Sequence, residues 1–269
     1  MQLRFDEDLV EEVVFLCASR RWKSAPALQI HRFHREREKL YSVLDPDDRN
    51  AAFFSLHLEW FREWGMEANL VNVLKEFPLF ETMLEILAFR QARGQAEEGA
   101  ELYVQSSAGR HGVIALRSAR FENERALTQF LRHELMHLHD MVDPRFGYSR
   151  QLPVSNASQQ RLVRERYRLV WDVAIDGRLV NAGRLPKQQQ ELRLAEFNRA
   201  FPFWPEEQRR RAFDALWNEA SPRHDRLLSV AADPRDLQTA HKPQPGAPCP
   251  LCGFTTFNWT NVTQLDATM

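Results

Sequence analysis

Residues 131–140 read LRHELMHLHD and lie within a segment, 123–143, whose apolar residues recur at intervals of three and four. This period predicts an amphipathic helix. Residues four apart share one face of a helix, so the imidazoles of His133 and His137 can reach the same metal ion. Glu134 follows the first histidine, where its carboxylate can take a proton from metal-bound water. The segment therefore predicts a zinc site with two histidine ligands and Glu134 as the catalytic base.

A β-hairpin is predicted just before this helix. Residues 101–105 and 112–117 are short apolar runs, and the connection between them contains glycine, which is typical of two paired strands. Apolar residues at helical spacing, together with capping residues and prolines, predict helices in most of the remaining chain. These helices are expected at 46–64 with Asp45 as N-cap, at 79–91, at 159–180 and after Pro186.

The H-E-x-x-H motif at 133–137, on a helix that follows a strand, resembles the active site of the zincin metallopeptidases. The likeness runs from about residue 101 to residue 180. HELMHLHD followed by WDVAID at 171–176 is similar to the peptidase family of the mitochondrial inner membrane that processes an ATP synthase subunit. The strand-to-helix context resembles the regulatory peptidases that cleave phage and stress repressors. In zincins the strand before the active-site helix pairs with the extended substrate, and the resemblance gives that role to residues 112–117.

The resemblance also implies a third zinc ligand. Metzincins place it six residues after the second histidine, behind a glycine, whereas positions 140 and 143 of this chain are both Asp. Gluzincins take a carboxylate from a second helix, and an acid four residues later supports a ligand histidine. Asp172 and Asp176 match that spacing, with Asp in place of the usual Glu. We therefore expect Asp172 to bind zinc and Asp176 to orient a histidine.

Other roles for these groups stay open. Glu165 lies on nearly the same helical face as Asp172 and is the alternative third ligand. Asp172 and Asp176 would otherwise form ion pairs with Arg168 and Arg178. Two more polar residues follow the motif. Asp140 is expected to support His137 or to cap the helix, and His139 is expected at the surface. The donor that stabilises the oxyanion is left open among Tyr148, Tyr167, Arg178 and His224.

The predicted fold is α+β and predominantly α-helical, with a zincin-like core in which a small β-sheet packs beside the H-E-x-x-H helix. Residues 1–95 are expected to be a helical N-terminal region, since a polar, glycine-containing stretch at 91–99 favours a boundary there. Residues 96–232 are expected to be the zincin-like catalytic region with a helical extension. Residues 233–269 are expected to be a proline-rich tail.

The tail contains the pair Cys249 and Cys252, separated by two residues. This spacing is typical of one half of a zinc knuckle, and a closed site needs four ligands. His241 is the nearest candidate to complete a second, structural zinc site, with His224 and Cys17 as alternatives. The two cysteines otherwise remain thiols without metal, or one thiolate inhibits the enzyme by binding the catalytic zinc.

The composition excludes several classes of protein. The chain has 269 residues with 36 Lys+Arg against 37 Asp+Glu, so it lacks the basic excess of a dedicated nucleic-acid binder. Acidic residues interrupt the first apolar segment, so no signal peptide is expected, and no apolar stretch reaches the roughly 20 residues of a membrane span. Only three cysteines occur, which favours a reducing, cytoplasmic location.

Taken together, these features predict a zinc-dependent peptidase that acts on peptide or protein substrates. Nucleic acid is not an expected partner. Two alternatives are a zinc hydrolase that acts on bonds other than peptide bonds and a regulatory or interaction protein whose zincin site has lost its activity.

Overall fold

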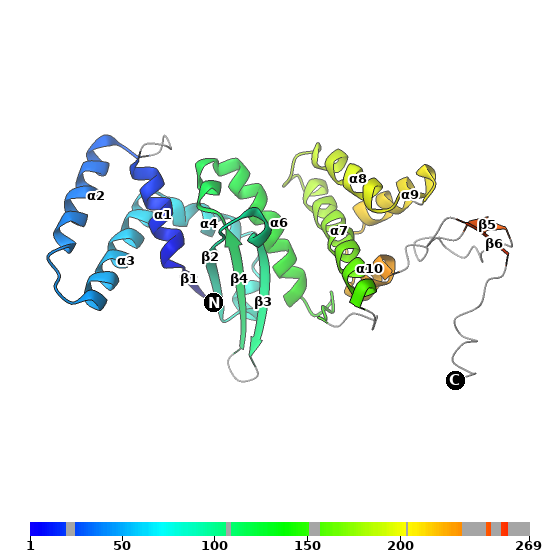
Figure 1. Ribbon diagram of the computed structural model, residues 1–269, viewed down its shortest axis with the longest axis horizontal. Helices are drawn as coiled ribbons and strands as arrows, with labels where there is room; N and C mark the ends of the chain where they lie inside the picture. The colour runs from blue at the N-terminus through cyan, green and yellow to red at the C-terminus, as the bar shows by residue number, and fades with distance from the viewer. Residues whose placement is uncertain are drawn as a thin grey trace. The chain divides into compact units, whose positions relative to one another are not determined.

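The computed structural model describes residues 1–19, 25–105, 109–150, 157–202, 204–232, 246–248 and 254–257. The chain folds as two compact units, Met1–Phe146 and Gly147–Met269, here named the N-terminal unit and the C-terminal unit. Figure 1 shows the helices and strands of both. Among the described residues, no helix is both long and apolar enough to cross a membrane.

The N-terminal unit is built on a mixed four-stranded sheet with the order β1-β2-β4-β3. Its strands are β1 (Gln2–Phe5), β2 (Ile86–Gln91), β3 (Gly99–Gln105) and β4 (Gly109–Leu116). The first two strands and β4 run parallel, and β3 pairs antiparallel with β4, with Leu102 opposite Gly112. The predicted hairpin before the long helix is therefore confirmed, although each strand begins two or three residues earlier than expected.

The N-terminal unit also contains helices of several lengths. Asp45 caps one of them as predicted, since its side chain accepts hydrogen bonds from the backbone N–H groups of Asp47 and Asp48 at 2.9 and 3.0 Å. The helices of the unit are α1 (Glu7–Ala18), α2 (Ala27–Leu40), α3 (Pro46–Glu63), α4 (Met66–Leu74), α5 (Phe80–Met83) and α6 (Glu124–Val142), with the short 3-10 helices η1 (Gln95–Glu97) and η2 (Ser118–Glu122).

The helix expected at 79–91 was wrong. Only Phe80–Met83 is helical there, and Ile86–Gln91 forms β2. Leu87 and Phe89 are fully buried and alternate with less buried neighbours, which is the period of a strand. A short apolar run suits either structure, and pairing with β1 on one side and β4 on the other stabilises the strand here.

The boundary expected between residues 95 and 96 also differs from the structure. Strands β1 and β2 precede that point and β3 and β4 follow it, yet all four share one sheet. The division between the two compact units instead follows Phe146. The N-terminal region therefore contributes half of the sheet rather than helices alone, and the polar stretch at 91–99 is a connection within one unit.

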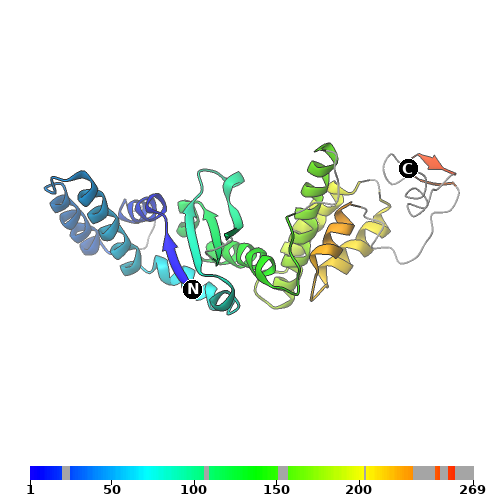
Figure 2. The same cartoon turned by 90° about the horizontal axis from the view of Figure 1, so that it is seen from below.

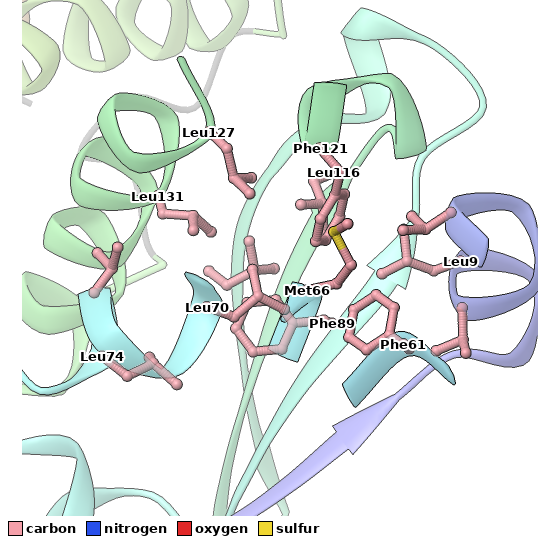
Figure 3. Close-up of a cluster of buried hydrophobic side chains, with 14 of the residues drawn as sticks. Leu9, Phe61, Met66, Leu70, Leu74, Phe89, Leu116, Phe121, Leu127 and Leu131 are labelled. Carbon is pink, nitrogen blue, oxygen red and sulfur yellow. The ribbon is translucent and has the colours of Figure 1, made fainter. Parts of the chain in front are cut away.

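The core of the N-terminal unit lies between the sheet and α1, α4 and α6, as Figure 3 shows. Leu127 and Leu131 of α6 meet Leu70 of α4 and Phe89 of β2 in this layer. Gly112 lets β4 approach α6 closely, because a Cβ atom at this residue would lie 2.6 Å from a methyl carbon of Leu138.

The C-terminal unit is a helical bundle arranged along its longest helix. In Figures 1 and 2, α8, α9 and α10 pack around α7. Gly177 allows the closest approach, since a Cβ atom there would lie 2.0 Å from the backbone oxygen of Trp217. The elements are α7 (Ala157–Asn181), α8 (Gln189–Ala200), α9 (Glu206–Trp217), α10 (His224–Ala232) and the two short strands β5 (Ala247–Pro248) and β6 (Thr255–Thr256).

The predicted α+β class with a helical majority is confirmed, and the sheet packs beside α6 as expected. The helix expected at 159–180 corresponds to α7. Helix α8 and helix α9 follow Pro186, also in agreement with the sequence pattern.

Candidate metal and catalytic site

Helix α6 spans Glu124–Val142, which agrees with the helix predicted within residues 123–143. The Asn123 side chain accepts a hydrogen bond from the backbone N–H of Ala126 at 3.0 Å, which satisfies one of the donors left open at a helix start. Every third or fourth residue is then an apolar residue that is buried against the sheet and α4, namely Leu127, Leu131, Leu135 and Leu138. This burial fixes the rotation of the helix, and so fixes the direction in which its polar residues point.

His133 and His137 lie side by side on α6. Their Nε2 atoms are 3.2 Å apart, and their ring centroids are 4.9 Å apart. Two nitrogens that each lie 2.0–2.1 Å from a tetrahedral zinc ion would be separated by about 3.3 Å. The two imidazoles are therefore already spaced as a pair of ligands to one ion.

Glu134 is buried beside this pair, with 9% of its surface exposed. Its Oε2 atom faces the beginning of β3, because a Cβ atom at Gly99 would lie 3.8 Å from it. Gly99 has a φ of +154°, a conformation that side chains rarely adopt. The carboxylate predicted to act as the base thus lies against the backbone at the start of β3.

The strand expected to pair with substrate was wrongly identified. Residues 112–116 belong to β4, which is paired with β2 on one side and with β3 on the other. Both of its edges are therefore occupied within the sheet. The last strand on this side of the four-stranded sheet is β3, which is also the strand that begins beside Glu134.

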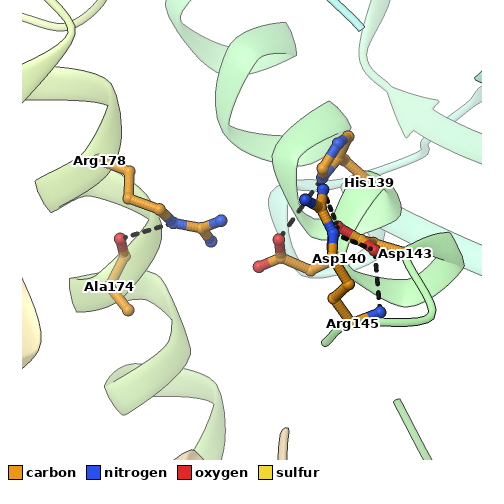
Figure 4. Close-up of polar contacts among 6 residues, drawn as sticks. All are labelled: His139, Asp140, Asp143, Arg145, Ala174 and Arg178. Carbon is orange, nitrogen blue, oxygen red and sulfur yellow. Dashed lines mark hydrogen bonds and ion pairs between the residues drawn. The ribbon is translucent and has the colours of Figure 1, made fainter. Parts of the chain in front are cut away.

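Two polar residues near the end of α6, His139 and Asp140, follow the motif. The expected support of His137 by Asp140 stays a prediction. His139 is half-buried: its ring lies 6.1 and 6.4 Å from the rings of Phe77 and Phe80, and 24% of its side chain is exposed. Asp140 is buried and does not cap the helix, which ends at Val142 with Asp143 as C-cap. Figure 4 shows Asp140 beside His139, where Oδ1 and Nδ1 are 3.7 Å apart.

Asp143 pairs with Arg145 in the same view, with 2.9 Å between Oδ2 and Nη2. Hydrogen bonds from this guanidinium hold the pKa of Asp143 below its usual value. Because Asp143 closes the helix in this way, it serves a structural purpose at the position where metzincins carry a ligand.

Asp172 and Asp176 are held by a residue that the sequence analysis missed, Arg193 on α8. The guanidinium of Arg193 donates to Asp176 over 2.5 Å and lies 3.4 Å from Asp172. Gln189, one turn earlier on α8, donates to Asp176 over 2.8 Å. Asp176 is fully buried, and 13% of the Asp172 side chain is exposed. Within the C-terminal unit, Asp176 is therefore the more tightly bound carboxylate and Asp172 the more accessible one.

Burial alone would lower the pKa of Arg193, but the charges of Asp172 and Asp176 raise it above its usual value. Glu196 also accepts from this guanidinium, over 2.7 Å. Arg168 is exposed, and Nε of Arg178 donates to the backbone oxygen of Ala174 over 3.2 Å, as Figure 4 shows. The pairing of these two arginines with Asp172 and Asp176 stays a prediction.

The remaining predicted site residues of the C-terminal unit are the alternative ligand Glu165 and three of the candidate oxyanion donors, Tyr148, Tyr167 and His224. Glu165 is exposed and accepts a hydrogen bond from Arg161 over 3.0 Å. The hydroxyl of Tyr167 and Nδ1 of His224 are 2.7 Å apart. The ring of Tyr148 lies 5.4 Å from that of His224. Burial lowers the pKa of His224. Two of the proposed oxyanion donors are therefore already bonded to each other in an aromatic cluster.

The predicted second zinc site lies outside the described residues, since Cys249, Cys252 and His241 all belong to segments that the structure does not describe. Of the alternative ligands, Cys17 is fully buried in the core of the N-terminal unit. His224 lies in the aromatic cluster of the C-terminal unit.

Comparison with protein families, curated proteins and solved structures found no match to this chain.

Proposed function

We propose that this protein is a zinc-dependent peptidase. The observation that carries the proposal is the pair of Nε2 atoms of His133 and His137, 3.2 Å apart, with the buried carboxylate of Glu134 on the same helix beside a terminal strand. Two histidines separated by one helical turn, with an acid next to the first, are the residues that a water-activating zinc site requires.

A bound zinc ion would lower the pKa of its water ligand and polarise the carbonyl of the scissile bond. Glu134 would act as the general base, accepting a proton from the attacking water and delivering it to the leaving amine. Its place on the same helix as the two histidines, directly after His133, favours this role.

The substrate in this proposal lies along the outer edge of β3. An extended peptide can add a strand to the edge of a sheet, where backbone hydrogen bonds supply the affinity. Since β3 starts at Gly99, next to Glu134, a peptide aligned with this strand would pass the catalytic carboxylate. Gly99 has no side chain to obstruct that passage.

Asp172 is the third ligand in this proposal, as the sequence predicts. Its carboxylate oxygen is a ligand of a type that zinc accepts together with imidazole nitrogens. Its weaker contact with Arg193, 3.4 Å against 2.5 Å for Asp176, leaves Asp172 the better placed of the two to bind metal. Asp176 then connects α7 to α8 through its ion pair with Arg193.

A second, structural zinc ion at Cys249, Cys252 and His241 remains part of the proposal. The number of zinc ions per chain shows whether this second site exists beside the catalytic one. One zinc per chain supports the catalytic site alone. Two, of which one is lost in Cys249→Ser and the other in His133→Ala, support both sites.

The proposed activity is tested by profiling cleavage of a peptide library with the zinc-loaded protein and with Glu134→Gln. We expect the variant to keep its zinc and to lose cleavage by about 10²-fold or more, since it has lost its general base. A wild-type protein that binds zinc and hydrolyses esters or amides but no peptide would favour the zinc hydrolase alternative. Intact zinc with no hydrolysis would favour the inactive regulatory protein.

A further inference from the structure

A buried ion-pair cluster lies immediately before Gly99 in the N-terminal unit. The carboxylate of Glu98 accepts hydrogen bonds from Nε and Nη2 of Arg120 over 2.8 and 2.7 Å and from the backbone N–H of Arg117 over 3.1 Å. Nε of Arg117 lies 3.3 Å from the same carboxylate. One carboxylate thus faces two guanidinium groups. The side chains of Glu98, Arg117 and Arg120 together carry a net charge of +1, and the charge of Glu134 lies near Arg120.

The guanidinium of Arg120 is placed close to the proposed catalytic base. Its Cζ atom lies over the ring of Phe130, 4.1 Å from the centroid, and Phe130 is one helical turn before Glu134 on α6. Its partner Glu98 adjoins Gly99, where a Cβ atom would lie 3.8 Å from Glu134. Arg120 therefore lies beside both the start of β3 and the turn of α6 that leads to Glu134.

The guanidinium of Arg120 is held in position by Glu98 before any ligand binds, and its Nη1 atom can still donate hydrogen bonds. Nε and Nη2 are bound to Glu98, while Nη1 makes no hydrogen bond within the part of the chain that the structure describes, and 25% of the side chain is exposed. Hydrogen bonds to Glu98 raise the pKa of Arg120, and the charge of Glu134 raises it further, so the group stays charged. A cation held in place before binding loses little freedom when a ligand arrives.

We propose that Arg120 binds a carboxylate group of the peptide, so that the site selects substrates with a negative charge at the position that lies against residues 98–99. Nη1 of Arg120 offers charged N–H donors, and hydrogen bonds from a guanidinium to a carboxylate are among the strong ones in proteins. The carboxylate belongs either to an acidic side chain or to the C-terminus of the peptide. The inference rests on the proposed function, because it places the ligand on the same site.

A purely structural role for Arg120, in which it only fastens η2 to β3 through Glu98, would give no preference between charged and neutral peptides. Binding therefore separates the two roles. The zinc-loaded Glu134→Gln variant provides the background, since it does not turn the peptides over. One set of peptides differs only in a free or an amidated C-terminus, and a second, amidated set differs in Glu or Gln at each position.

We expect the acidic member of at least one pair to bind about tenfold more tightly, as suits a hydrogen bond between charged groups. The preferred pair identifies the source of the carboxylate. Adding Glu98→Gln and Arg120→Gln together, which avoids an unpaired buried carboxylate, should abolish the preference while circular dichroism shows an unchanged fold. Arg125→Gln is the matched control, because Arg125 is exposed near the start of α6, and it should keep the preference.

Equal affinity for both members of every pair would overturn the inference and leave the proposed peptidase function standing. A preference that survives in the Glu98→Gln/Arg120→Gln protein would overturn the role of Arg120. A zinc-loaded protein that binds none of the peptides would contradict the inference and the proposed function alike.

Discussion

The Nε2 atom of His133 lies 3.2 Å from the Nε2 atom of His137, on consecutive turns of α6. If both nitrogens bind zinc, replacing either histidine with alanine removes a ligand and should abolish tight zinc binding. Asp172→Ala should weaken zinc binding as well, since a catalytic site has three protein ligands. Zinc content after gel filtration, measured by inductively coupled plasma mass spectrometry, checks all three variants.

His139→Ala provides the control for these variants, because His139 packs against Phe77 and Phe80. It should retain zinc at the level of the wild-type protein. Zinc content that is unchanged in His133→Ala and His137→Ala would exclude these residues as ligands.

Arg193 is expected to stabilise the C-terminal unit strongly. Its removal in Arg193→Met leaves Asp176 fully buried without its cation, along with Asp172. Breaking a buried ion pair from one side costs about 3–5 kcal/mol of unfolding free energy. Arg161→Met, which breaks the exposed pair with Glu165, should cost no more than about 0.5 kcal/mol. Urea unfolding measures both, and equal effects would contradict the structural role given to Arg193.

Gly177 should not tolerate a side chain. Alanine at this position would place its Cβ atom 2.0 Å from the backbone oxygen of Trp217, so α7 and α9 would have to separate. Overpacking of this kind costs about 1–3 kcal/mol. Gly94→Ala is the control, since no atom lies within 4 Å of the added Cβ there. Thermal unfolding that gives the same midpoint for both variants would show that the two helices adjust freely.

His57 should make the stability of the N-terminal unit depend on pH. Burial among the rings of Phe15, Phe33 and Phe53 lowers its pKa from the usual 6.5 to about 4, and the charge of Arg37 adds to this. The folded protein favours neutral His57, so this contribution to stability is complete above pH 6.5 and is lost as the pH falls toward 4.

The loss attributable to His57 is about 2–3 kcal/mol between pH 7 and pH 4.5. His57→Phe removes the titrating group and keeps an aromatic ring of similar size. Its unfolding free energy should therefore decrease less over this range than that of the wild-type protein. Parallel pH profiles for the two proteins would contradict the assigned pKa.

The local features of this site were predictable from the sequence because they depend on neighbouring residues. His133, Glu134 and His137 belong to one helix, and helical periodicity determines which side chains share a face. The antiparallel hairpin before α6 followed for the same reason, since a short connection joins its strands.

Features that depend on distant segments were not predictable in this way. The run at 86–91 becomes a strand because it pairs with β1, more than 80 residues earlier, and with β4. The identity of the edge strand depends on the position of β2 next to β4. Arg193 follows Asp176 by 17 residues, and only the packing of α8 on α7 brings the two together. The Gln189 and Arg193 pair, four apart on one helical face, was the available signal.

The most direct test of the proposed zinc peptidase measures cleavage of a peptide library by the wild-type protein before chelation, after removal of zinc by a chelator and after zinc is added back. We predict cleavage in the first and third measurements and none in the second. Equal cleavage in all three, or the absence of cleavage from a fully zinc-loaded protein, would contradict the account.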